Sequence, residues 1–244
     1  MSKNFELLRR AGWAEECLEG IPDPGDTARE RFQPGPVSLP HDPDQISILV
    51  QRIFGESCNP AIRSVLFTGV AGSGGASSVC VRAAQKLAAK VRNRVCVVDA
   101  NVHSPSVHRY FGQQNSVGLT GAIADPKHAG HFVKPVPGKN LWFLPAGSPG
   151  ANRRAILASP DFSSCLKELK RYFEYLLIDA TFAVNHKIAA LGHVIDGAVL
   201  VMSSSGVAPD LAVKARERLQ ATDVKLLGMV LDDSKASLLD QLRN

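Results

Sequence analysis

The 244-residue sequence lacks the features that would place it in several large classes of protein. Its cysteines form no CxxC pair and no other spacing typical of a metal site; they are Cys17, Cys58, Cys80, Cys96 and Cys165. No apolar run is long enough to span a membrane, and the first residues lack the apolar core of a signal peptide. We therefore expect a cytoplasmic protein whose cysteines are free thiols, most of them in apolar surroundings.

Charge of either sign is also modest. Charged residues make up 21% of the chain, hydrophobic residues make up 45%, and the formal net charge is +5. This balance is ordinary for a globular protein and does not favour nucleic acid as a partner. The length is enough for one large α/β domain or two small ones, with a buried core.

The chain divides into three parts by composition. Residues 1–19 carry apolar residues at helical spacing and predict a short N-terminal helix. Residues 20–43 hold six prolines and three glycines, which indicates a linker without regular structure. Residues 44–244 have the pattern of a folded domain, and we expect this domain to begin with a helix.

Strands and helices alternate through this domain. Continuous apolar runs bounded by turn residues predict buried strands, and helical patterns lie between several of them. The strands are expected at 62–68, 94–100, 140–147, 175–180, 197–203 and 224–232, and the helices at 44–56, 77–90, 161–173 and 209–220. This order predicts an α/β fold, a three-layer sandwich in which helices cover both faces of a mostly parallel central sheet.

A glycine-rich stretch, FTGVAGSGGASSVC at 67–80, joins the first of these strands to a helix. Such a loop can bind phosphate through backbone N–H groups and the helix N-terminus. In the common form, G-x-x-x-x-G-K-[ST], two registers are possible here. The preferred one puts Ala76 in the lysine position and Ser77 in the Mg²⁺-ligand position; the other puts Gly75 and Ala76 there. Neither register has a lysine, so a glycine-rich turn without ligand stays open.

Two aspartates strengthen the ligand-binding interpretation. Asp99 ends the strand RVCVVDA, and Asp179 ends the strand YLLIDA. Ligands of parallel sheets bind at the carboxyl ends of the strands, which is where both aspartates and the glycine loop lie. A single such aspartate is more often a turn or helix cap, but the combination with Ser77 predicts a Mg²⁺ site.

The order of these motifs resembles the bacterial tyrosine kinases of the CpsD/CapB/Wzc type, which are relatives of the MinD/ParA deviant-Walker P-loop ATPases. The stretch VCVVDANVHSPSVHRYFG, followed by GL, is similar to the second motif of that family, with matches at Asp99, Pro105, His108 and Phe111. LPAGSPGANRRAILASP, FEYLLIDATF and DGAVLVM are similar to three further family segments. The resemblance covers residues 45–232, and it implies a P-loop NTPase-like fold.

The resemblance also implies a function and a site. It implies a role in exopolysaccharide or capsule biosynthesis and export, ATP or ADP with Mg²⁺ as cofactors, and recruitment to the inner membrane by the cytoplasmic tail of a membrane polysaccharide co-polymerase. It is compatible with a homo-oligomer. Asp99 and Asp179 would be the catalytic residues, and Ser77, Asp99 and Asp179 would hold Mg²⁺. The nucleotide-binding residues would be Gly72, Ser73, Gly74, Gly75, Ala76, Ser77, Ser78 and Asp232.

Several positions depart from the family pattern. Ala76 stands where the family has its catalytic lysine, Ala71 where MinD/ParA proteins have a signature lysine, and Asn101 where the family has a second aspartate. The chain has three tyrosines and ends in KASLLDQLRN, without a tyrosine-rich tail. Because one cation at a transferring phosphoryl group is worth roughly 10³–10⁵ in rate, we expect a degenerate nucleotide-binding member with weak or no phosphoryl transfer. An active kinase with a non-standard Walker A motif and a ParA/MinD-like positioning ATPase are the alternatives.

Overall fold

The structure, a computed structural model, describes residues 37–39, 43–55, 61–69, 75–148, 157, 159–180, 191–203, 209–220 and 223–232. The helix predicted within residues 1–19 lies outside these ranges, as do most of the predicted linker and residues 70–74 of the glycine-rich loop. The proposed division into three parts therefore stays a prediction.

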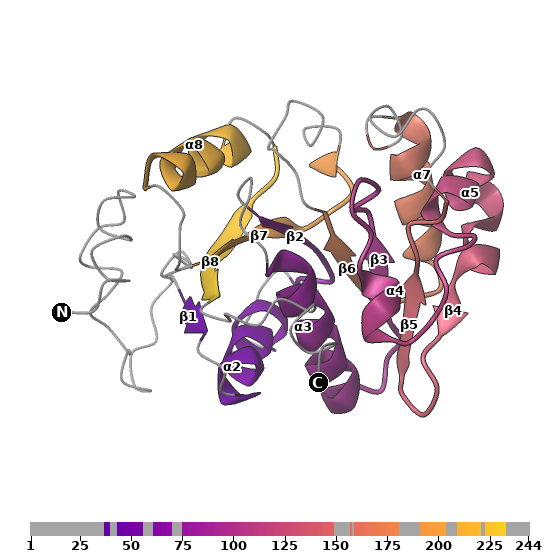
Figure 1. The fold of residues 1–244 in the computed structure, drawn as a ribbon, viewed down its shortest axis with the longest axis horizontal. Coiled ribbons are helices and arrows are strands. Elements are labelled where there is room, and N and C mark those ends of the chain that lie inside the picture. Colours follow the sequence, from indigo (N-terminus) through magenta and orange to yellow (C-terminus); the bar gives the residue numbers. More distant parts are fainter. Residues whose placement is uncertain are drawn as a thin grey trace.

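One sheet forms the centre of the molecule, and its strands run in the order β1-β8-β7-β2-β6-β3-β5-β4 (Figure 1). All neighbouring strands are parallel except β4, which is antiparallel to β5. The strands are β1 (Val37–Leu39), β2 (Ser64–Gly69), β3 (Val95–Asp99), β4 (Lys134–Pro135), β5 (Leu141–Leu144), β6 (Tyr175–Asp179), β7 (Gly197–Ser203) and β8 (Leu226–Asp232). Every strand predicted from an apolar run is confirmed, with ends shifted by up to three residues.

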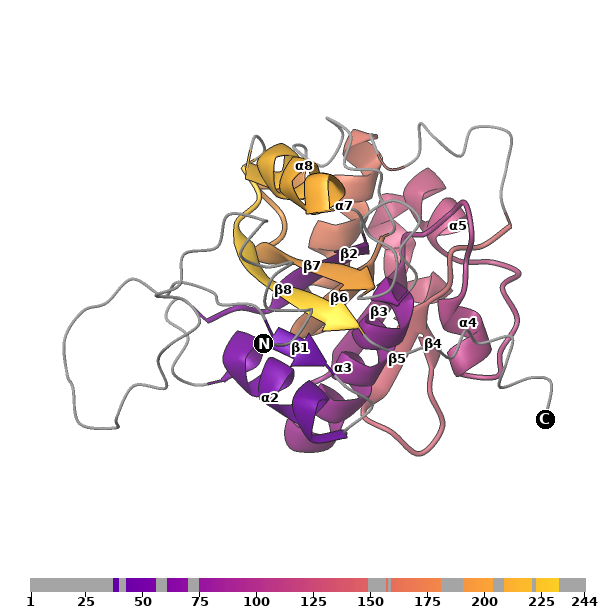
Figure 2. The ribbon, with the colours of Figure 1, turned by 60° about the vertical axis from the view of Figure 1, so that its left-hand side comes forward.

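Helices cover both faces of this sheet. Figure 2 shows α2 (Pro43–Phe54) and α3 (Ala76–Lys90) below the sheet and α7 (Pro160–Leu169) and α8 (Pro209–Gln220) above it. The buried residues form two clusters, one under α2 and α3 and the other under α5 (Leu119–Ala124), α7 and α8. Alternate strand residues supply the two clusters, as the two-residue period of a strand requires. The three-layer α/β fold expected from the sequence is confirmed.

Some elements of the fold were not expected. The short helix α4 (Val107–Tyr110), the helix α5, the 3₁₀ segment η2 (Pro126–Phe132) and the strand β4 all lie between β3 and β5. Each is seven residues or shorter, so its periodicity is too brief to stand out in a sequence.

The strand β1 lies inside the segment predicted to be an irregular linker. It pairs in parallel with β8, from Val37↔Val230 to Leu39↔Asp232. Proline flanks it at Pro36 and Pro40. A proline cannot donate to a central ladder but is tolerated at a strand end on a sheet edge. The composition of the segment could not reveal three residues that pair with a distant strand, and residues 20–36 and 40–42 lie outside the described ranges.

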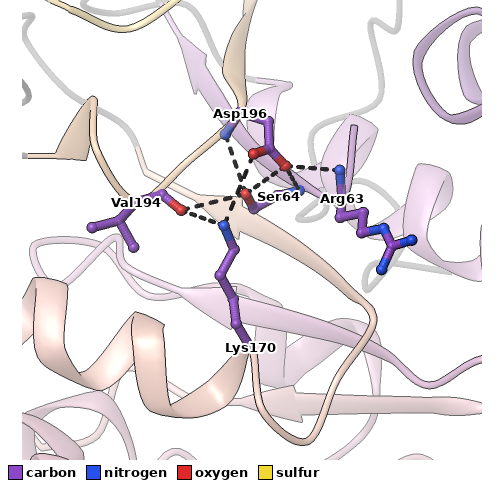
Figure 3. A network of polar contacts seen from close by, with 5 residues as sticks. All are labelled: Arg63, Ser64, Lys170, Val194 and Asp196. Atoms are coloured by element: carbon purple, nitrogen blue, oxygen red, sulfur yellow. Dashed lines mark hydrogen bonds and ion pairs between the residues drawn. The ribbon is translucent and has the colours of Figure 1, made fainter. Parts of the chain in front are cut away.

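A network of polar contacts closes the amino ends of β2 and β7 (Figure 3). The Asp196 carboxylate accepts hydrogen bonds from the backbone N–H of Arg63, from the backbone N–H of Ser64 and from the Ser64 hydroxyl, each at 2.8 Å. Lys170 donates to the Val194 carbonyl at 2.5 Å and lies 3.9 Å from Asp196. The chain itself thus satisfies the Asp196 carboxylate and the backbone groups around it.

Two further expectations concern thiols and membranes. Cys80, Cys96 and Cys165 are free and buried, as predicted, whereas Cys17 and Cys58 lie outside the described residues. Within the described ranges, no helix has the length and apolar character needed to cross a membrane.

Candidate functional site

The helix α3 begins where the glycine-rich loop ends. Gly75 directly precedes the helix and has a φ of 109°, a conformation that favours glycine over other residues. A Cβ atom at Gly75 would also collide with the Asp232 carboxylate, which lies at the end of β8. Gly75 therefore permits both the turn into α3 and the close approach of Asp232. The other predicted loop residues Gly72, Ser73 and Gly74 lie outside the described residues.

Asp99 and Asp179 lie side by side at the carboxyl edge of the sheet. They are partners in the register of β3 and β6, and both are fully buried. Their strand neighbours Val97 and Leu177 belong to the cluster under α3, so the alternation of strand residues turns both carboxyls toward that helix. Both charges also act on the Cys80 thiol in the second turn of α3, where burial and the two carboxylates raise the thiol pKa.

Asp179 is an unsatisfied buried carboxylate. Neither of its side-chain oxygens has a hydrogen-bond partner among the described residues. Burial raises its pKa to about 6, and the neighbouring Ser77 hydroxyl opposes this shift without forming a hydrogen bond of acceptable geometry. A buried carboxylate without partners is costly, and such an exception in a fold calls for an explanation, of which a bound ion is one.

Asp99 is satisfied in a different way. Its Oδ1 accepts the backbone N–H of Asn101 at 3.1 Å, and its Oδ2 accepts those of Ser106 and Val107 at 3.2 and 3.1 Å. Burial and the charge of Asp179 raise the pKa of Asp99 to about 7, although these three N–H groups oppose the rise. Asp99 thus performs the turn-capping role that a lone aspartate usually has, and it holds the start of α4 next to the site.

Ala76 is the first residue of α3, and its side chain is only 3% exposed. It packs within the cluster under α3, so the position expected for the lysine carries an apolar methyl group in the core. A lysine here would have to leave this packing to reach a phosphate. Ser77 and Ser78, the next two residues, are half-buried.

Two site residues were not anticipated. The Thr68 hydroxyl, near the end of β2, is buried without a partner among the described residues. Tyr110 packs partly against the cluster under α3, and its phenol also lies near the site. Burial raises the pKa of Tyr110, the Ser78 hydroxyl opposes this rise, and the charges of Asp179 and Asp232 add to it. Both residues lie inside the motif stretches FTGVAGSGGASSVC and VCVVDANVHSPSVHRYFG, but not at positions expected to bind a ligand; the packing of β2 and α4 brings them to the site.

The residues present fit Mg²⁺ in chemical type, since all are oxygen donors. Within the described parts of the chain, however, no group of three or more His, Cys, Asp or Glu residues could hold a metal ion. Mg²⁺ commonly binds through one or two carboxylates and completes its shell with water and substrate phosphates. The unsatisfied Asp179 beside Ser77 matches this kind of incomplete site.

Comparisons with known proteins find bacterial tyrosine kinases among the relatives of this chain. No family model matches the chain. It is 29% identical over 195 residues to the tyrosine-protein kinase YwqD of Bacillus subtilis, covering 80% of this chain and 82% of the relative. It is 25% identical over 183 residues to the putative tyrosine-protein kinase CapB of Staphylococcus aureus, covering 74% and 79%.

Solved structures of the same fold agree with these relatives. The kinase domain of the Escherichia coli tyrosine kinase ETK superposes with a TM-score of 0.70 at 17% identity, covering 86% of each chain. A ParA family ATPase from Chlorobium tepidum superposes with a TM-score of 0.57 at 15% identity, covering 73% and 77%. The homologues of this chain are bacterial tyrosine kinases, and its fold is the one that they share with ParA-like ATPases.

Proposed function

We propose that this homologue of bacterial tyrosine kinases is a degenerate nucleotide-binding protein that retains a Mg²⁺–nucleotide site and performs phosphoryl transfer weakly or not at all. The observation that carries the proposal is the unsatisfied, buried Asp179 beside Ser77, next to a helix that starts with a buried alanine. The site keeps the groups that would hold the metal but has no lysine at Ala76.

Each residue of the site has a proposed role. The start of α3 and the loop before it would bind phosphate through backbone N–H groups, and Gly75 permits the close approach. Ser77 and Asp179 would hold Mg²⁺, which supplies charge neutralisation at the phosphates when bound. Asp99 would lie beside Asp179 on the adjacent strand. Where transfer occurs, it would take the proton from the hydroxyl group that receives the phosphoryl group. Asp232, which lies against Gly75, would line the nucleotide side of the loop.

The setting of this activity is a second part of the proposal. We place the protein in exopolysaccharide or capsule biosynthesis and export, where it would regulate a membrane polysaccharide co-polymerase by binding its cytoplasmic tail at the inner membrane. Two observations support this setting. The chain is related to tyrosine-protein kinases, and the absence of a lysine at residue 76 favours regulation over catalysis. Co-purification with the full-length co-polymerase tests this partner. A co-polymerase truncated to remove its cytoplasmic tail is the control and should not co-purify.

Calorimetry with ATP and ADP, in the presence and absence of Mg²⁺, tests the site. We expect weak binding that requires Mg²⁺ and that Asp179→Asn abolishes. Asp223→Asn, at an exposed aspartate outside the site, should bind like the unaltered chain. Absence of binding at millimolar nucleotide would overturn the proposal and leave the loop as a structural turn.

The variant Ala76→Lys tests the missing cation. A lysine side chain that reaches the phosphates should raise nucleotide affinity by about tenfold or more, in line with one charge-assisted hydrogen bond of roughly 1.5–3 kcal/mol. Because Ala76 is buried, thermal unfolding must first show that the variant is folded. Unchanged affinity in a folded variant would contradict the assignment of residue 76 to the lysine position.

A further inference from the structure

A cavity lies at the amino ends of β3 and β5, far from the proposed nucleotide site. It has a volume of about 310 Å³ and is bounded by η2, the edge strand β4, its neighbour β5 and the residues that follow α7. Arg94, which directly precedes β3, and Trp142 on β5 both line it. Since parallel strands share their direction, this end of the sheet is opposite to the end that carries Asp99 and Asp179.

Aromatic rings form the body of this cavity. Trp142 and Phe173 have ring centroids 5.7 Å apart at 54°, and the Arg94 guanidinium lies 5.7 Å from the Trp142 centroid. Tyr172, which also lines the cavity, is 48% exposed. A large aromatic side chain left at the surface beside other rings offers a stacking surface for a flat ring.

Cationic and hydrogen-bond-donating groups surround these rings. Arg94, Lys127, His128 and His131 all line the cavity, and the two imidazoles stack at 5.4 Å. The Nδ1–H of His128 donates to the Asp125 carboxylate at 2.8 Å, so Nε2 is the ring atom left for a ligand, and it donates to that ligand only when the ring carries both protons. None of the described residues that line the cavity carries a carboxylate or a side-chain amide.

This lining selects a class of ligand. A neutral sugar needs acceptors for its hydroxyl groups, and among these side chains acceptors are scarce. Several cationic and donor groups in one lining instead suit an anionic group that only accepts hydrogen bonds, and phosphate is recognised in this way by arginine clusters. The volume is at the lower limit of ligand pockets and suits one ring with one anionic group.

We propose that this cavity binds a phosphotyrosine side chain presented by another protein. Trp142, Tyr172 and Phe173 would pack on the aryl ring, and Arg94, Lys127 and the two histidines would bind the phosphate. The proposal does not depend on nucleotide binding, because the two sites lie at opposite ends of the sheet. It would let the chain recognise the product of a tyrosine kinase without being one.

Titration of the full chain with an acetylated, amidated phosphotyrosine peptide flanked by glycines tests this proposal, in the absence of nucleotide. Calorimetry should show saturable binding below about 1 mM. Trp142, one of the two tryptophans of the chain, should report the same binding by a change in fluorescence. The matching tyrosine peptide and the phosphoserine peptide should bind at least ten times more weakly.

Charge-matched variants separate the cavity from the net charge of the protein. Arg94→Gln combined with Lys127→Gln should weaken phosphopeptide binding by at least tenfold. Arg92→Gln combined with Lys139→Gln removes the same charge at exposed positions outside the cavity and should change it less than twofold.

Three outcomes would overturn the inference: no saturable binding, equal binding of phosphoserine, or equal loss in both double variants. Tighter binding of AMP than of the phosphotyrosine peptide would also overturn it, in favour of a nucleotide. Failure of the nucleotide titration at the Asp179 site would leave this result untouched.

Discussion

Two aspartates at opposite ends of the same sheet have opposite environments. Asp196 precedes β7 at the amino end, and its carboxylate accepts three hydrogen bonds from Arg63 and Ser64 (Figure 3). Asp179 ends β6 at the carboxyl end, is fully buried and has no hydrogen-bond partner among the described residues. The chain itself satisfies the first carboxylate, whereas the described residues offer the second no hydrogen-bond partner.

The difference between Asp196 and Asp179 illustrates that an unsatisfied buried charge can mark a candidate binding site. A protein can tolerate the free-energy cost of an unsatisfied buried carboxylate when a ligand supplies the absent interactions. The free energy regained on binding then adds to the affinity for that ligand. The raised pKa values of Asp179 and Asp99 express this cost, and both arise first from burial. At the amino end, no buried side-chain oxygen of the described residues lacks a partner.

Replacement of Asp196 should have the largest effect on stability. In Asp196→Ala the backbone N–H groups of Arg63 and Ser64 lose their acceptor, which should cost about 2–4 kcal/mol after allowance for the partial exposure of the site. Urea unfolding measures this change. Asp196→Asn keeps one acceptor oxygen and should lose less; equal losses in the two variants would mean that the hydrogen bonds are not the cause.

Replacement of Asp179 should act in the opposite direction. Without ligand at pH 8, Asp179→Asn removes a buried charge and should raise the free energy of unfolding by about 1–2 kcal/mol, since one pKa unit corresponds to about 1.4 kcal/mol. Asp223→Asn, at an exposed position, should change it by less than about 0.5 kcal/mol. Destabilisation by Asp179→Asn as large as that by Asp196→Ala would remove the contrast between the two ends.

The pH dependence of stability should follow from the same pair. Both folded pKa values, about 6 for Asp179 and about 7 for Asp99, lie above the ordinary value of 3.8. The folded chain therefore binds these protons more tightly, and the stability that they contribute is full below about pH 4 and is lost as pH rises through 6 and 7.

Urea midpoints measured between pH 5 and 8 without Mg²⁺ test this expectation. The midpoint should fall with rising pH. The free energy of unfolding that it reports should fall by at most about 1.4 kcal/mol per pH unit for each group. Asp179→Asn should flatten the fall, because it removes one titrating group and the charge that raises the pKa of the other. A midpoint that rises over this interval in the unaltered chain would contradict the environment assigned to the pair.

Lys170 should contribute the least. Its ammonium donates to the Val194 carbonyl and lies 3.9 Å from Asp196, but it is one-third exposed. Lys170→Met keeps the stem and removes the charge, and it should cost only about 0.5–1 kcal/mol by thermal or urea unfolding. A loss that matches Asp196→Ala would show that Lys170, rather than the backbone donors, holds the amino end together.

The sequence by itself determined much of this protein. Continuous apolar runs followed by helical patterns were enough to predict the parallel sheet, and the position of Asp99 and Asp179 after two such runs was enough to place both at the same edge. The missing lysine at Ala76 is also visible in the sequence alone. These features are local, since they depend on residue type and spacing along a single strand, loop or helix.

Only the tertiary structure decided what these residues do relative to one another. The register of β3 and β6 brings Asp99 beside Asp179, and the N–H groups of Ser106 and Val107 satisfy the first and not the second. The collision that Asp232 would cause at Gly75, the pairing of β1 with β8 and the cavity beside Trp142 likewise join segments that are distant in the chain. Burial and hydrogen bonding between such segments depend on packing, which no single stretch of sequence encodes.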